Sequence, residues 1–219
     1  MLQYILFDLD GTLTDPGLGI TNSVIYALSK FGIPVSDRRE LYKFIGPPLL
    51  DSFRDYYGFS PEDSIRAVQY YREYFKDYGL YENEVYDGIP QVLAELKRQG
   101  FQLVLATSKP EEYAVEILKH FHLDQYFTFA AGATMDGTRS KKADVIAYAM
   151  SHCGITDPAS AIMVGDRKHD ILGAAEHGLK TIGVLFGYGS KEEFEQAGAV
   201  DMAQTPADIL SCIARQNRP

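Results

Sequence analysis

Two neighbouring carboxylates stand where they could do chemistry. Asp8 and Asp10 directly follow a short apolar run at residues 4–7, the pattern of a strand buried on both faces of a parallel sheet. An extended backbone turns both side chains the same way, so their charges repel unless a cation lies between them. A bound cation would keep Asp8 ionised, and a raised pKa would let Asp10 hold a proton as a general acid.

Two further polar clusters follow apolar runs of the same kind. Thr107 and Ser108 come after the run at 101–106, and Asp166 comes after the run at 161–164. Ligands of open parallel sheets bind beyond the carboxyl ends of the strands. We therefore expect all three clusters to meet at one edge of one sheet.

Strands and helices alternate over most of the chain, which predicts an α/β fold with a Rossmann-like parallel sheet covered by helices on both faces. Weaker strand patterns occur at 127–131 and 181–185. Helical patterns occur at 90–98, 111–120, 143–152 and 171–177, and Gly100, Gly154 and Gly178 stop the first, third and fourth of them. For a last helix, ending near Arg215, we predict Thr205 as the N-cap and Pro206 as the first residue.

Residues 16–81 interrupt this alternation with helical periodicity alone, and we predict helices there at 20–31, 49–57 and 61–78. The expected domains are an α/β core of residues 1–15 and 82–219 and a helical insert of residues 16–81. Because the insert leaves and re-enters the core beside the carboxyl end of the first strand, we expect it to act as a lid. The aromatic run from Tyr70 to Tyr78 has helical spacing and is expected to form the interior of the insert.

The order of these motifs resembles the phosphatase branch of the haloacid dehalogenase superfamily, and in particular phosphoglycolate phosphatases and 5′-nucleotidases with a helical cap. That branch has DxDGT after the first strand, Thr or Ser after the second, then a lysine, then GDxxxD. Four separately spaced motifs in the right order make the resemblance specific. Here they are residues 8–12, Thr107 with Ser108, Lys142 or Lys141, and residues 165–170.

The resemblance implies a magnesium-dependent phosphatase acting on small phosphomonoesters. Asp8 would attack phosphorus and form an aspartyl-phosphate, while Asp10 would protonate the leaving group and later deprotonate water. The implied Mg²⁺ ligands are Asp8, the backbone carbonyl of Asp10, and Asp166, with Asp170 close by.

The charge of the phosphate would be met by a second set of residues. The resemblance assigns this role to the Thr107 hydroxyl, to the Ser108 amide at a strand-to-helix turn, and to Lys142, with Lys109 as a secondary contact. We favour Lys142 over Lys141 because it directly precedes an apolar helical pattern. The stretch lacks the Lys-Pro-x-Pro form common among relatives, so both lysines stay open.

The segment Gly187-Tyr188-Gly189-Ser190 looks superficially like a phosphate loop. It lacks the glycine spacing and the adjacent lysine of a P-loop. We predict instead a turn into a helix that begins near Lys191, with Ser190 as its N-cap.

The composition and net charge indicate which kinds of molecule the protein can bind. The formal net charge of −9 opposes binding to nucleic acid or anionic membranes, so an anionic metabolite would depend on a metal and a few lysines for positive charge. No window approaches the roughly 18 apolar residues of a membrane span, and we expect a cytoplasmic, monomeric protein. Cys153 and Cys212 have neither metal-ligand nor disulfide-scaffold spacing.

Several rival functions share these motifs. Dehalogenation and phosphonate cleavage are disfavoured, because neither explains the second aspartate of the first motif. A sugar-phosphate mutase of the phosphoglucomutase type would keep all four motifs, and a catalytically silent binding protein would keep the fold. Phosphoglycolate, a nucleoside 5′-monophosphate, a sugar phosphate and pyrophosphate each suit the same core, so the motifs leave the substrate open.

Overall fold

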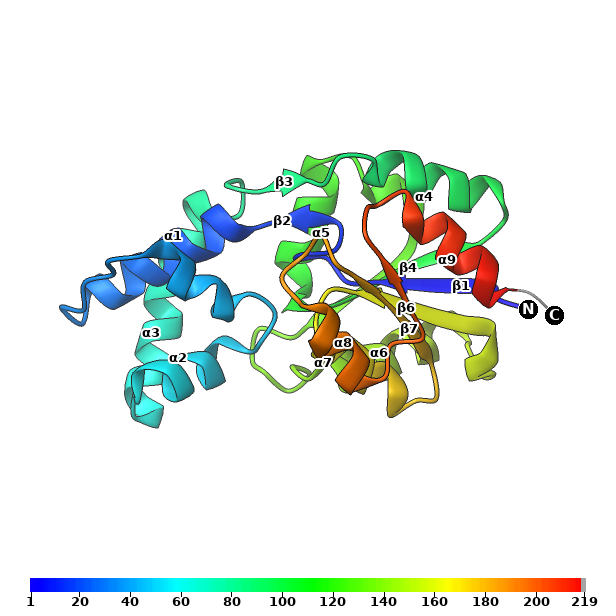
Figure 1. The fold of residues 1–219 in the computed structure, drawn as a ribbon. Helices are drawn as coiled ribbons and strands as arrows, with labels where there is room; N and C mark the ends of the chain where they lie inside the picture. The colour runs from blue at the N-terminus through cyan, green and yellow to red at the C-terminus, as the bar shows by residue number, and fades with distance from the viewer. Residues whose placement is uncertain (218–219) are drawn as a thin grey trace. The chain divides into compact units, whose positions relative to one another are not determined.

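The computed structural model describes residues 1–217 and divides into two compact units (Figure 1). One unit comprises Met1–Thr14 and Val85–Pro219, and the other comprises Asp15–Glu84. Two short strands, β2 (Thr14–Asp15) and β3 (Glu84–Val85), pair where the chain passes between them. The lid function of the inserted unit stays a prediction.

A six-stranded sheet forms the centre of the first unit. Its spatial order is β5-β4-β1-β6-β7-β8, and all neighbouring strands are parallel. From β1 the chain first adds β4 and β5 on one side and then β6, β7 and β8 on the other. The strand order therefore reverses at β1, and sheets of this kind bind ligands at the carboxyl end of the strands at this switch point. The predicted Rossmann-like α/β fold is confirmed. The strands are β1 (Tyr4–Phe7), β4 (Gln102–Pro110), β5 (Phe127–Ala133), β6 (Ala161–Gly165), β7 (Lys180–Val184) and β8 (Asp201–Ala203).

Helices cover both faces of this sheet, with α4 and α9 on one side and α6 and α7 on the other (Figure 1). On the second side, Leu6, Val104 and Met163 of the central strands are fully buried against Val145 and Ile146 of α6. Burial on both faces explains why these strands are continuous apolar runs in the sequence. The helices are α4 (Ile89–Arg98), α5 (Glu111–His120), α6 (Lys142–Cys153), α7 (Lys168–Ala175), α8 (Lys191–Ala197) and α9 (Asp208–Gln216).

The start of the last helix differs from the prediction. α9 begins at Asp208, and Thr205 is not its N-cap. Instead, the backbone N–H and the hydroxyl of Thr205 both donate to Asp208 Oδ2, at 2.8 and 2.9 Å. A tight turn from Thr205 to Asp208 therefore precedes the helix, with Pro206 inside that turn.

The inserted unit is helical, as predicted, with two departures. A 3-10 helix at Arg38–Phe44 was not predicted, and the helix expected at 61–78 breaks into an α-helix and a π-helical turn, η2 (Phe75–Gly79). Within the aromatic run, Tyr71 and Phe75 are buried and their rings stack 5.3 Å apart, whereas Tyr78 is 62% exposed. The run is thus only partly interior. The α-helices are α1 (Gly17–Ser29), α2 (Leu49–Tyr57) and α3 (Pro61–Tyr74). Nowhere in residues 1–217 is a helix both long enough and apolar enough to cross a membrane.

Candidate active site

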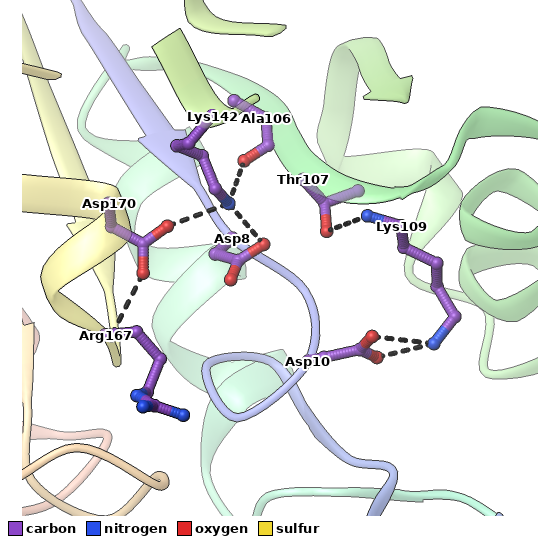
Figure 2. A network of polar contacts seen from close by, with 8 residues as sticks. All are labelled: Asp8, Asp10, Ala106, Thr107, Lys109, Lys142, Arg167 and Asp170. Atoms are coloured by element: carbon purple, nitrogen blue, oxygen red, sulfur yellow. Dashed lines mark hydrogen bonds and ion pairs between the residues drawn. The ribbon is translucent and has the colours of Figure 1, made fainter. Parts of the chain in front are cut away.

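Three buried carboxylates and one buried lysine meet at the carboxyl edge of the sheet. Asp8 follows β1, Asp166 follows β6, and Asp170 lies in the first turn of α7. Lys142 is the first residue of α6, and its Nζ lies 2.8 Å from both Asp8 Oδ1 and Asp170 Oδ1 (Figure 2). The same ammonium donates to the carbonyl oxygen of Ala106 at 3.0 Å. Two of the three predicted strand-end clusters, those containing Asp8 and Asp166, therefore do come together.

This group is suited to a divalent cation. One carboxylate oxygen from each of Asp8, Asp166 and Asp170 lies within 4.8 Å of the others. Opposite ligands of an octahedral Mg²⁺ stand about 4.2 Å apart, so little movement would bring these oxygens onto one ion. Asp166 Oδ1 is buried and has no hydrogen-bond partner, an arrangement that is costly for a carboxylate unless a cation or a proton compensates.

Burial and the neighbouring charges shift the pKa values of Asp166, Asp170 and Lys142. Burial raises the pKa of Asp166 well above its usual range, and the charges of Asp170 and Asp8 raise it further. Burial also raises the pKa of Asp170 to about 6, although Lys142 opposes the shift. For Lys142, burial lowers the pKa, but the attraction of Asp170 and Asp8 outweighs it and the net pKa is raised. Three acids thus face one ammonium, an excess of negative charge that a divalent ion would offset.

Asp10 stands apart from this group and pairs with Lys109. Both carboxylate oxygens of Asp10 lie 2.7 Å from Lys109 Nζ (Figure 2), and both side chains are largely buried. Burial raises the pKa of Asp10, which is the direction expected of a general acid, while Lys109 opposes the shift. Lys109, expected only as a secondary substrate contact, is thus a direct partner of Asp10.

The remaining predicted residues lie along β4 and at the start of α6. Thr107 is buried, and its Oγ1 accepts a hydrogen bond from the Lys109 backbone N–H at 3.3 Å. Ser108 is half-buried and lies within β4, which continues to Pro110. Its expected place at a strand-to-helix turn is wrong by two residues, because β4 continues to Pro110, which still pairs with Ala133 of β5, and α5 follows at Glu111. Lys141 is exposed, so Lys142 is the lysine that reaches the carboxylates.

Backbone groups complete the site, and these were not predicted. The N–H of Tyr188 donates to Asp166 Oδ2 at 2.8 Å, and the carbonyl of Ala106 accepts from Lys142. Gly11, with φ +81°, passes so close to Asp166 that an added Cβ would lie 2.5 Å from its Cγ. A positive φ and this close approach both require glycine at that position. In the sequence, this close approach is marked only by Gly187 and Gly189, which were predicted to be part of a turn.

Comparison with known proteins agrees with this geometry. A family model described as haloacid dehalogenase-like hydrolase matches residues 5–184. The 5′-nucleotidase of Pseudomonas aeruginosa is 48% identical over 189 residues, which are 86% of this chain and 85% of that protein. The tyrosine-protein kinase PtkA of Mycobacterium tuberculosis is 43% identical over 188 residues, 85% of this chain and 63% of that protein.

A solved structure extends the similarity to the whole fold. The crystal structure of a predicted phosphatase from Clostridium acetobutylicum superposes with a TM-score of 0.96 at 48% identity, covering 98% of this chain and 99% of that chain. The chain therefore belongs to the haloacid dehalogenase-like hydrolases, as the order of its motifs predicts.

Proposed function

We propose that this hydrolase is a magnesium-dependent phosphatase that cleaves small phosphomonoesters through an aspartyl-phosphate on Asp8. The observation that supports it most is the position of Asp8, which is buried at the switch point of the sheet, ion-paired to Lys142 and adjacent to two further carboxylates. A buried carboxylate that is ion-paired to an ammonium can act as a nucleophile for phosphorus.

The chain's own residues divide the reaction between them. Lys142 is ion-paired to Asp8 Oδ1 and would also meet the charge of the entering phosphate, while one oxygen of Asp8 would make the in-line attack. Asp10 would give a proton to the leaving alkoxide and take one from the water that hydrolyses the aspartyl-phosphate. Mg²⁺ bound by Asp8, Asp166 and Asp170 would supply positive charge against the repulsion between these carboxylates and the phosphate.

The test is phosphate release from para-nitrophenyl phosphate. We expect turnover with Mg²⁺, loss of turnover with chelator, and a fall of more than about 10³-fold in Asp8→Asn. Asp144→Asn, which changes an exposed aspartate on α6, is the matched control and should keep full activity. A wild-type protein inert in both conditions would favour the silent binding protein, and equal activity of Asp8→Asn would exclude Asp8 as the nucleophile.

Nucleoside 5′-monophosphates are the proposed substrate class. The similarity to the Pseudomonas aeruginosa 5′-nucleotidase, spread over most of both chains, supports this choice over phosphoglycolate, sugar phosphates and pyrophosphate. A panel of these compounds at equal concentration should give the highest kcat/KM for a 5′-nucleotide. Isomerisation of a sugar phosphate without phosphate release would instead indicate a mutase.

The similarity to PtkA supports a second candidate, phosphoryl transfer to tyrosine. The chain spans only 63% of that protein, so more than a third of the kinase has no counterpart here. Incubation with ATP labelled at the γ-phosphate, with and without a tyrosine-containing peptide, separates the two functions. A phosphatase releases inorganic phosphate, whereas a kinase labels the peptide.

A further inference from the structure

A segment that none of the motifs includes contacts the acidic motif at its first aspartate. We call residues 187–193 the clamp segment. Its Tyr188 N–H donates to Asp166 Oδ2 at 2.8 Å. The preceding Gly187 lies so close that an added Cβ would stand 2.5 Å from Asp166 Cβ and would also collide with the Gly11 carbonyl oxygen. Only glycine lets the backbone approach Asp166 this closely.

The other end of the clamp segment contacts the start of α7. Glu193, in the first turn of α8, accepts the Lys168 backbone N–H at 2.6 Å and the Arg167 Nε–H at 3.2 Å. A carboxylate that accepts a backbone N–H forms a strong, charge-assisted bond. Since α7 begins at Lys168 and contains Asp170, this bond holds the helix that presents the last carboxylate of the site.

Both aspartates of the acidic motif are thereby restrained from outside the motif. Asp166 and Asp170 repel each other and Asp8, so without restraint their side chains would separate. The Tyr188 amide fixes one oxygen of Asp166, while the other oxygen, Oδ1, is buried without a hydrogen-bond partner. Asp166 Oδ1 is therefore positioned to bind a metal ion, although the Asp166 carboxylate is repelled by Asp8 and Asp170.

We infer that the clamp segment is a positioning element that sets the affinity of the site for Mg²⁺, with Gly187 and Glu193 as its positioning residues. This inference rests on the magnesium-dependent function proposed above. Groups that orient metal ligands typically contribute about 10- to 100-fold in metal affinity. The expected effect is therefore on Mg²⁺ binding, and turnover at saturating Mg²⁺ should change little.

The decisive comparison is Glu193→Ala against Glu192→Ala. Both remove one negative charge from the first turn of α8, but Glu192 is exposed on the helix surface whereas Glu193 contacts α7. By isothermal titration with MgCl₂, we expect the Kd to rise about 10-fold in Glu193→Ala and to stay within about twofold in Glu192→Ala. Glu193→Gln keeps an acceptor oxygen and should fall between them.

Gly187→Ala provides a second, independent perturbation and should weaken Mg²⁺ binding at least as much. Circular dichroism at the titration temperature establishes that each variant is folded, and if Gly187→Ala does not fold, the Glu193 pair decides alone. A folded Glu193→Ala with wild-type Kd, or an equal loss in Glu192→Ala, would overturn the inference and leave the proposed function standing. Failure of the wild-type protein itself to bind Mg²⁺ would overturn the proposed function as well.

Discussion

Lys142 contacts two of the three clustered carboxylates. Its buried ammonium has three oxygen partners, Asp8, Asp170 and the Ala106 carbonyl, each within 3.0 Å. Burying a charge is costly, and the cost is recovered only while all its partners are present. Lys142 therefore links the stability of the site to its chemistry.

Replacing Lys142 by Met should expose this dependence. Because the carboxylates would lose their cation, the free energy of unfolding in chelator should fall by about 3–5 kcal/mol, and activity should be nearly abolished. Urea denaturation followed by circular dichroism measures the first effect. The neighbouring Lys141→Met, at an exposed side chain, should change stability by no more than about 0.5 kcal/mol. Similar losses in both variants would contradict the assignment.

At the scale of single residues, most side-chain groups of the site were predicted from the sequence, whereas the Tyr188 amide and the Ala106 carbonyl were not. Asp8 and Asp166 were recognisable because each follows a continuous apolar strand pattern, and Lys142 because its place between the other motifs matches the order of the family that the chain resembles. The Tyr188 amide leaves no such signature, since every residue except proline has an N–H. The pairing of Lys109 with Asp10 depends on two strands meeting in space, which residue spacing alone does not specify.

Among the elements, those with a strong apolar pattern in the sequence were predicted, and those with a weak pattern were not. β1, β4 and β6 are buried on both faces, and their continuous apolar runs are visible in the sequence. β8 has only three residues, too few to show a period, and the 3-10 helix at Arg38–Phe44 follows no α-helical pattern. The N-cap predicted at Ser190 is confirmed. The N-cap predicted at Thr205 is wrong, because Thr205 instead donates hydrogen bonds to the Asp208 side chain.

The cap of α3 gives a prediction for the inserted unit. Ser60 Oγ accepts the Asp63 N–H at 3.1 Å, and Pro61 occupies the first helical position. Ser60→Ala removes that acceptor and should lower the free energy of unfolding by about 1 kcal/mol, as measured by urea denaturation with far-UV circular dichroism. Ser36→Ala, in an exposed bend outside the helices, should have no measurable effect. An unchanged midpoint for Ser60→Ala would show that the cap does not stabilise α3.

For the molecule as a whole, the site is a source of instability as well as of activity. The chain already has a net charge of −9, and folding concentrates three of its carboxylates within a few ångströms in a buried place. Self-repulsion of this kind opposes the compact state, and proteins accept such costs at functional sites. A cation that binds only the folded state reverses the balance by mass action.

Replacing Asp166 by Asn should abolish the stabilisation by Mg²⁺ without lowering the stability of the metal-free protein. At a Mg²⁺ concentration ten times its Kd, linkage predicts about 1.4 kcal/mol of stabilisation, which raises the Tm of a chain of this size by about 3–6 °C. Asp166→Asn has one repelling charge fewer, so in chelator its Tm should equal or exceed that of the wild type, and Mg²⁺ should no longer raise it. Thermal denaturation of both proteins with chelator and with Mg²⁺ tests this, and Asp144→Asn should keep the wild-type response. If Asp166→Asn were instead less stable than the wild type in chelator, Asp166 would be a structural residue rather than one kept, at a cost to stability, for the metal.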